Sequence, residues 1–238
     1  MGARMARRVE EDSGIEARRL ATLARHLGRA YPAGPWWPFD DPFEIAVSAL
    51  LTQQTRWAAV EIAIAALRRE RLLTPPALAA APRETVERIL RPTGFYRQKA
   101  RAVQGIARIL VERFGGSIDH AFRLPTFALR EELLSWPGVG EEMADSILLY
   151  AAGRPVFVVD AYTYRLMERF GATQPDHRVP YLVAAKGWSR AVKGGAPAFK
   201  AMHGAVVELC KGHCTRSPDC ASCPLEAACP KIGVAPRQ

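Results

Sequence analysis

Four cysteines lie close together near the carboxyl end of this 238-residue chain, where their thiolates could hold a metal. Cys214, Cys220, Cys223 and Cys229 follow the spacing C-x5-C-x2-C-x5-C. In a cytosolic protein such clustering favours metal over disulfides, and four thiolates suit either a tetrahedral zinc ion or a four-iron cluster. The wide outer gaps do not match the two C-x2-C knuckles typical of structural zinc. We therefore expect a 4Fe-4S cluster, with zinc as the alternative and Cys210 as a buried helix residue.

A single carboxylate, Asp160, follows the short apolar run VFVV at residues 156–159. Because the run is apolar, we expect Asp160 to be partly buried. A fixed carboxylate in a dry pocket stabilises positive charge that develops on a reacting group, and it can orient an attacking water.

A sharp turn, Pro137-Gly138-Val139-Gly140, separates two helical patterns ahead of Asp160. A proline and two glycines within four residues force a tight turn and leave its backbone uncovered. Glu141 and Glu142 suit the first turn of the second helix, where the helix dipole favours negative charge. The unpaired amides at a helix start can face an anion such as phosphate. Taken alone, the turn also fits an ordinary connection between two helices.

Trp36 and Trp37 lie next to each other in a proline-rich loop. Such residues either plug the core beneath a loop or form an aromatic wall that stacks on a flat base. Of these two interpretations, the loop alone favours the plug.

Two further loops combine polar and aromatic residues. Gln53 lies at the junction of two apolar helical patterns, where it either bonds to backbone or enters a duplex to fill the gap left by an extruded base. The stretch GFYRQKA contains Phe95, Tyr96 and Lys99 at a helix start. This mixture suits phosphate binding with stacking or wedging, or else a plain helix start with solvated cations.

Helical patterns cover nearly the whole chain. Asp41 and Pro42 are suited to the N-cap and first position of a buried helix. Residues 156–159 form the only strand-like run, so we expect an all-α fold of roughly ten to twelve helices. The expected helices cover residues 15–30, 43–52, 57–71, 76–91 as one or two pieces, 103–114, 124–136, 141–152, 161–170 and 199–211.

The composition limits the partners and the location. The net charge is +9, which suits a polyanion, although a generally basic surface gives the same value. No apolar run approaches the roughly 20 residues that span a membrane, and the charged start is not followed by the apolar block of a secretory signal. We expect a cytoplasmic, nucleoid-associated monomer with disorder at residues 1–13.

The stretch from residue 134 to 164, together with the cysteines, resembles the helix-hairpin-helix Gly/Pro-Asp superfamily of DNA glycosylases. The matching residues are Pro137-Gly138-Val139-Gly140, Ala144 and Val159-Asp160. The resemblance covers about residues 30–230 and implies a two-lobed all-α fold that acts on double-stranded DNA in base-excision repair. It also implies that Gly138, Val139 and Gly140 hold the DNA backbone and that Asp160 drives base removal.

The same resemblance assigns roles to residues in other loops. Gln53 matches the glutamine that family members push into the vacated stack, and Phe95 falls where an apolar wedge enters the opposite strand. The cysteine loop is similar to the cluster loop of endonuclease III and the adenine-mismatch glycosylases, although their first gap is one residue longer.

One position departs from the strand-cleaving members of the family. They carry a lysine two residues after the second hairpin glycine, and this chain carries Glu142 there. A lysine forms a Schiff base with the sugar and then cleaves the strand, which a glutamate cannot do. The resemblance therefore implies base removal by water, with the abasic site left uncut.

The segments WWP, LLTQQT, RPTGFYRQKA, ADSILLY and MHGAVVE look like the endonuclease III-like 3-methyladenine glycosylases. That subgroup implies a base pocket made by Trp36, Trp37, Glu142 and Lys211. Glu142 could equally serve only its own helix. A member of the subgroup lacks the cysteine loop, which instead links this chain to endonuclease III.

We therefore expect a DNA glycosylase that excises alkylated purines such as 3-methyladenine. The alternatives are an oxidised-pyrimidine or mismatch glycosylase, and a protein that binds DNA or abasic sites without turnover. We expect one lobe at residues 14–42 and 156–211, a six-helix barrel at 43–155 with its hairpin at 134–152, a cluster loop at 212–230 and a tail at 231–238. The cleft between the lobes would hold Asp160 and the pocket residues.

Overall fold

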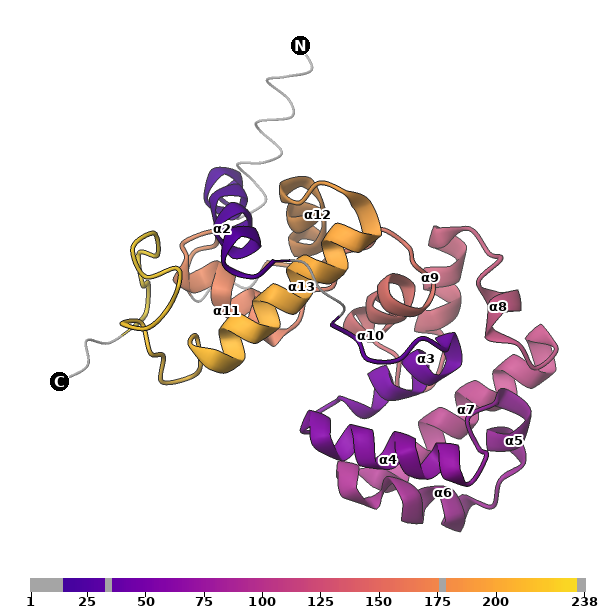
Figure 1. Ribbon diagram of the computed structural model, residues 1–238. Helices are drawn as coiled ribbons and strands as arrows, with labels where there is room; N and C mark the ends of the chain where they lie inside the picture. The colour runs from indigo at the N-terminus through magenta and orange to yellow at the C-terminus, as the bar shows by residue number, and fades with distance from the viewer. Residues whose placement is uncertain (1–14, 33–35, 176–178, 235–238) are drawn as a thin grey trace. The chain divides into compact units, whose positions relative to one another are not determined.

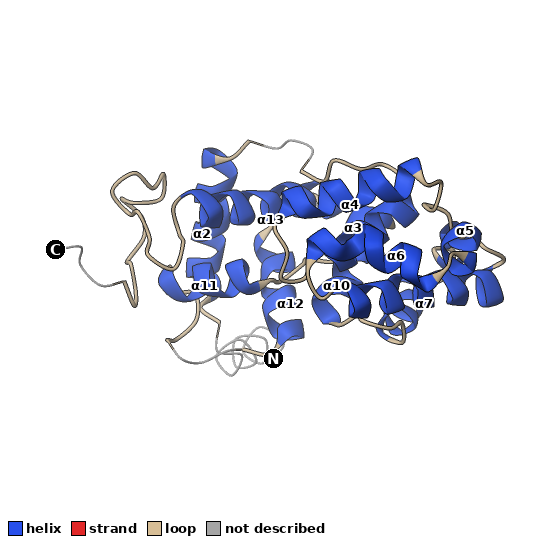
Figure 2. Cartoon of the chain, turned by 90° about the horizontal axis from the view of Figure 1, so that it is seen from below, coloured by secondary structure: helices blue, strands red, loops and turns tan. Residues whose placement is uncertain are grey.

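The computed structural model describes residues 15–32, 36–175 and 179–234 (Figure 1). Its described part consists of helices and loops and contains no strand, which confirms the predicted all-α class (Figure 2). An isolated antiparallel bridge joins Ile15 to Thr173. The predicted disorder at residues 1–13 lies outside the described residues. None of the described helices is both long enough and apolar enough to cross a membrane.

The chain divides into two compact units, one formed by Met1–Trp36 with Pro155–Gln238 and the other by Trp37–Arg154. The first boundary therefore lies between the two adjacent tryptophans, whereas the sequence predicted it between residues 42 and 43. The second boundary lies one residue before the predicted one. Each unit is described by itself below.

The central unit, Trp37–Arg154, is built around a nearly all-buried helix, α3. Asp41 caps α3 as predicted, because its Oδ1 accepts the Glu44 N–H at 2.8 Å and Pro42 occupies the first position. The long helix α7 packs against α5 and α6. The elements are α3 (Pro42–Leu51), α4 (Trp57–Arg69), α5 (Pro75–Ala80), α6 (Arg83–Leu90), the 3-10 turn η1 (Arg91–Thr93), α7 (Tyr96–Phe114), α8 (Ile118–Ala121), α9 (Thr126–Leu134), α10 (Glu141–Ser146) and the π-helical turn η2 (Ile147–Ala151).

The other unit contains α2 (Ala17–Ala30), α11 (Ala161–Arg169), α12 (Tyr181–Ala191) and α13 (Gly195–Gly212), followed by the cysteine loop. Helix α12 was not expected, because the glycines and prolines of residues 172–195 suggested breaks. Pro180 instead precedes the first turn, and a Cβ on Gly187 would come within 3.0 Å of Ile15 and 3.2 Å of Leu20. Gly187 thus allows α2 to approach α12 closely, and it does not end the helix.

Candidate active site and nucleic-acid interface

Asp160 is the N-cap of α11, and its two carboxylate oxygens have different surroundings. Oδ1 accepts hydrogen bonds from the Thr163 backbone N–H and from Thr163 Oγ1, both at 2.7 Å. The Asp160 N–H donates back to Thr163 Oγ1 at 3.4 Å, which completes a capping box. Oδ2 faces Nε2 of His203 on α13 at 3.7 Å. The helix therefore uses one oxygen and leaves the other directed at His203.

The carboxyl group of Asp160 is held in its charged form. Its side chain is 14% exposed, which confirms the predicted partial burial. Burial raises the pKa of this carboxyl, but the contact with His203, the charge of His203 and the bonds from Thr163 outweigh it and lower the pKa below its usual value. Asp160 is therefore ionised at neutral pH.

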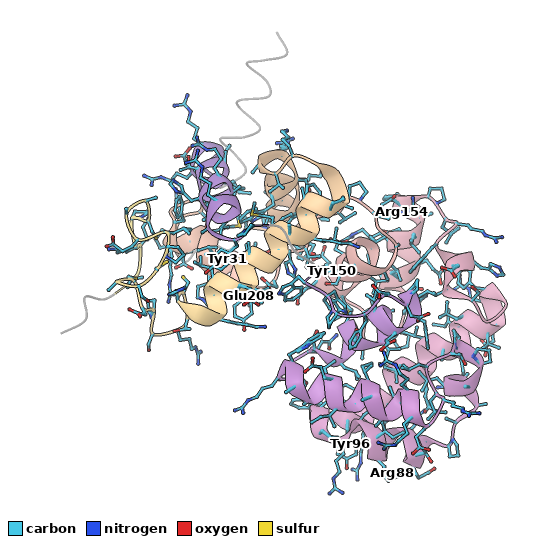
Figure 3. The ribbon with its side chains drawn as sticks, viewed as in Figure 1. Tyr31, Arg88, Tyr96, Tyr150, Arg154 and Glu208 are labelled. Atoms are coloured by element: carbon cyan, nitrogen blue, oxygen red, sulfur yellow. The ribbon has the colours of Figure 1, made fainter. Side chains whose placement is uncertain are left out.

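Trp36 packs on one face of α13, next to the residue that faces Asp160. Its ring meets His203 edge-on, with centroids 5.4 Å apart and an interplanar angle of 85°. Its Nε1 donates to Glu208 at 3.3 Å, and Lys211 Nζ lies 5.8 Å from the ring centroid. A Cβ on Gly204 would come within 2.8 Å of the indole, so only a glycine allows this close packing. Figure 3 labels Glu208 on α13.

Trp37 belongs to the central unit and packs among other aromatic residues. Its Nε1 donates to Ser48 Oγ at 3.1 Å. Its ring lies edge-on to Trp57 at 5.6 Å and tilted against Tyr150 at 4.7 Å; Tyr150 is labelled in Figure 3. Trp36 and Trp37 both remain half-buried. The two adjacent tryptophans thus pack against different units.

The hairpin turn is held by packing on one side and an ion pair on the other. Gly138 has a φ of +79°, and a Cβ on Gly105 of α7 would meet Pro137 at 2.6 Å. Arg130 of α9 binds the buried Asp145 of α10 at 2.7 Å. Gly140 begins α10 without a side-chain cap. The packing and the ion pair thus fix the conformation of the turn. Glu142 follows the turn as an exposed residue in the first turn of α10.

Gln53 and Phe95, the two residues expected to enter DNA, line the same cavity. The cavity has a volume of about 210 Å³, and Gly138 of the hairpin also lines it. Gln53 donates from Nε2 to the Gly138 carbonyl at 3.0 Å. Phe95 is 62% exposed and adopts a left-handed φ of 45°, which is rare for a residue other than glycine. The structure therefore brings three sequence-distant predicted contacts together.

Lys99 departs from its predicted place at the surface. It is 5% exposed, and its Nζ donates to the Leu51 carbonyl at 3.0 Å, to the Thr93 carbonyl at 2.8 Å and to Thr55 Oγ1. Burial lowers the pKa of Lys99 to about 8. Lys99 lines the cavity of Gln53 and Phe95, but its ammonium is directed at protein oxygens at the end of α3 and in η1, and not at phosphate. Tyr96, which is labelled in Figure 3, is half-buried. The guanidinium carbon of Arg97 lies 5.7 Å from the centroid of its ring.

The four cysteines of the C-terminal loop line a common cavity. Among the described residues, no three His, Cys, Asp or Glu side chains are arranged to hold a single metal ion. Arg169 of α11 donates from Nη1 to Cys214 Sγ at 3.3 Å, and Arg165 donates to the Cys214 carbonyl at 2.8 Å. Cys210 is buried in α13, as predicted. The loop is therefore tied to the helix that Asp160 begins.

The sequence did not reveal His203 or the Arg130–Asp145 pair. His203 stands among buried apolar residues of α13, and a lone histidine in such a pattern gives no indication of its partner. The pairing of Arg130 with Asp145 depends on the packing of α9 against α10, which sequence spacing alone does not fix.

Comparisons with known proteins agree with the resemblance. The sequence pattern of the HhH-GPD superfamily base excision DNA repair proteins matches residues 47–188. MJ1434 of Methanocaldococcus jannaschii, whose name describes it as a DNA repair glycosylase, is 37% identical over 195 residues, which is 82% of this chain and 88% of that protein.

Two solved structures are also similar. A trapped covalent intermediate of endonuclease III with DNA has a TM-score of 0.77 at 26% identity and covers 91% of this chain and 97% of its own. The 3-methyladenine DNA glycosylase of H. pylori bound to 1,N6-ethenoadenine has a TM-score of 0.67 at 25% identity, with coverages of 81% and 95%. The chain therefore belongs to the HhH-GPD superfamily of base excision DNA repair proteins, as an endonuclease III-like DNA glycosylase.

Proposed function

We propose that this glycosylase excises alkylated purines such as 3-methyladenine with water and leaves the abasic strand uncut. The observation that carries the proposal is Glu142, in the first turn of α10. Strand-cleaving relatives carry a lysine at this position, and its amine attacks the sugar to form a Schiff base. Because a carboxylate cannot form an imine, water is the nucleophile that remains.

Asp160 supplies the charge that base removal needs. Departure of the base leaves the sugar with positive, oxocarbenium-like character. The ionised Oδ2, which the capping box does not use, stabilises this charge and orients the attacking water. Because alkylated purines are cationic leaving groups, Asp160 and an aromatic pocket are sufficient for their removal.

In this proposal Trp36 and Lys211 contact the extruded base within the unit that holds Asp160; for Trp37 and Glu142, which belong to the other unit, contact with the base remains a prediction from the sequence. Trp36 supports the assignment because Gly204 and Glu208 fix its ring on α13 while it stays half-exposed. A flat aromatic face stacks well on a flat base and on a cationic one. The H. pylori relative, whose structure holds the flat modified purine 1,N6-ethenoadenine, supports the same substrate class.

DNA is held in this proposal by the hairpin and by the cavity beside it. The backbone of Gly138, Val139 and Gly140 faces a phosphate, and Gln53 and Phe95, which line one cavity, enter the base stack. Tyr96 lies next to Phe95 at the start of α7. Lys99 is withdrawn from the predicted contacts because it is buried. The proposal also includes a monomer that acts on duplex DNA at the nucleoid.

The cysteine loop fits a 4Fe-4S cluster better than zinc. Each thiolate of such a cluster binds a different iron, so the ligands surround a cavity and do not converge on one point. The four cysteines line such a cavity, and Arg169 donates a hydrogen bond that stabilises the Cys214 thiolate. When bound, the cluster would hold the loop structurally, while Arg165 and Arg169 connect the loop to α11.

Two alternatives remain distinct from this proposal. The likeness to endonuclease III favours an oxidised-pyrimidine or mismatch glycosylase, in which any strand cleavage requires an amine other than residue 142. A protein that binds abasic sites without turnover is disfavoured by Asp160, because binding alone does not need a buried, ionised carboxylate.

The proposal is tested by incubating the protein with alkylated DNA and with duplexes that carry single lesions. The released base and the strand breaks are then measured. We expect 3-methyladenine release by the wild type, with breaks appearing only after alkali. Breaks without alkali that borohydride can trap would show that another amine acts as the nucleophile. Release of oxidised or mismatched pyrimidines alone would favour the first alternative, and tight binding without release from any duplex would favour the second.

A further inference from the structure

We propose that His203 is the residue that positions the catalytic oxygen of Asp160 and holds it ready for base removal. This inference rests on the proposed function of Asp160. His203 is a buried residue of α13, and the sequence of this helix does not indicate a role for it. His203 would act through Asp160 and would not touch the reacting sugar.

The geometry separates the tasks of the two carboxylate oxygens. Oδ1 is occupied by two 2.7 Å hydrogen bonds from Thr163, so rotation of the carboxylate is already restricted by the start of α11. Oδ2 is the oxygen left for chemistry, and the group it faces is Nε2 of His203 at 3.7 Å. The imidazole is only 6% exposed, so bulk water cannot readily replace it as a partner of Oδ2.

His203 is itself fixed by the wall of the proposed base pocket. Trp36 meets its ring edge-on at 5.4 Å, and Trp36 is held by the close approach to Gly204 and by the bond to Glu208. The chain of contacts from Trp36 through His203 to Asp160 lies within one unit. A base that stacks on Trp36 would therefore act, through the Trp36 ring, on His203, which faces the Asp160 carboxylate.

Positioning includes keeping the carboxylate charged after a substrate has excluded water. Burial favours the neutral acid, and the contact with His203 is the strongest of the effects that oppose it. The titratable groups that face Asp160 are His203 and Cys210, both on α13, while its partner on α11 is Thr163. An ordinary thiol carries no charge in acid, so Cys210 does not contribute to the acid limb. His203 is thus the group able to shift the acid limb.

The test is the pH profile of base release under single-turnover conditions with His203→Phe. Phenylalanine keeps an aromatic edge against Trp36 but removes Nε2. We expect the acid limb to move to higher pH by about one unit, with the rate recovering toward the wild-type value in alkaline solution. A profile of unchanged shape, lowered equally at every pH, would mean that His203 only supports the fold and would overturn the proposal.

His203→Gln provides a second test, because it keeps a neutral N–H donor. We expect a shift in the same direction and of smaller size, and an unchanged limb would count against the proposal even if His203→Phe fails to fold. The matched control is His26→Gln on α2 in the same unit, for which we expect the wild-type profile.

Carbon-13 titration of the Asp160 carboxyl in the free holoprotein measures the same effect without turnover. If the wild type releases no base, the proposed function fails, while a shift of this titration in His203→Phe would still show that His203 holds the carboxylate ionised. No shift, in a protein that does release base, would reject the role of His203 alone.

Discussion

Asp160 and Lys99 are both largely buried ionisable side chains, but their polar atoms make different numbers of hydrogen bonds to the protein. Asp160 gives one oxygen to the capping box of α11 and keeps the other beside His203. Lys99 directs its ammonium at three protein oxygens, from Leu51, Thr55 and Thr93. The comparison suggests that a buried charge with capacity left over serves chemistry, whereas one that is fully engaged serves the fold.

The largest effect expected from this comparison is the loss of base release in Asp160→Asn. Asparagine can still cap α11 through its oxygen, so the unfolding midpoint should change little. The amide cannot supply the negative charge, so we expect single-turnover base release to fall by a factor of about 100 or more. Rates and thermal unfolding are measured on the same preparations. Loss of stability equal to that of Lys99→Met would show that Asp160 also serves mainly the fold.

Lys99→Met should have the largest effect on stability. It leaves the Leu51 and Thr93 carbonyls without their buried donor, and we expect a loss of about 1–3 kcal/mol in the free energy of unfolding. Denaturant unfolding measures this loss. The control is Arg101→Met, two residues along α7, whose exposed side chain should change stability by no more than about 0.5 kcal/mol. Equal losses in both variants would contradict the structural role of Lys99.

Phe95→Ala should affect DNA and not the fold. The ring is 62% exposed, so its removal should change stability by no more than about 0.5 kcal/mol. Stacking on a base contributes about 1–3 kcal/mol, so we expect binding of an abasic-site duplex to weaken by roughly 10-fold. Phe127→Ala, which removes an even more exposed ring on α9, is the control. Unchanged binding in Phe95→Ala would remove Phe95 from the interface.

The same comparison shows which parts of the molecule the sequence could predict. Asp41 and Pro42 correctly predicted the start of α3, because an N-cap is formed by residues that are neighbours in the sequence. The hairpin and Asp160 were found for a similar reason, since each is a compact pattern in one stretch. Lys99 was expected at the surface because it follows Phe95 and Tyr96 at a helix start, and only the tertiary fold brings Leu51 and Thr93 to its ammonium.

The sequence predicted neither helix α12 nor the role of His203, because both depend on contacts between distant segments. A glycine in a helix suggests a break, but Gly187 allows the close approach of α2, which depends on a helix far away in the sequence. His203 faces Asp160 from a helix more than forty residues later in the chain. Sequence patterns thus predicted the elements and the local turns, while pairings between distant elements required the structure.

The smallest expected effect is the pH dependence of stability, to which Asp160 contributes in acid and Lys99 in alkaline solution, in both cases as a rise of stability with pH. The folded pKa of Asp160 is lowered, so its charge contributes stability that is present above the unfolded pKa and is lost as the pH falls through the folded one. The folded pKa of Lys99 is about 8 against an ordinary 10.5, so the unfolded chain binds more protons between these values. The contribution of Lys99 to stability should therefore rise from pH 8 to 10.5.

Denaturant unfolding at several pH values separates the two contributions. Relative to the wild type, Asp160→Asn should lose the part of the acid dependence that comes from the carboxyl, and Lys99→Met should lose the rise in alkaline solution. If Lys99→Met keeps the full alkaline rise, the ammonium of Lys99 is not desolvated in the folded protein. The two rises have different causes, because contacts with His203 and Thr163 favour the charge of Asp160 in the folded protein, whereas burial disfavours the charge of Lys99.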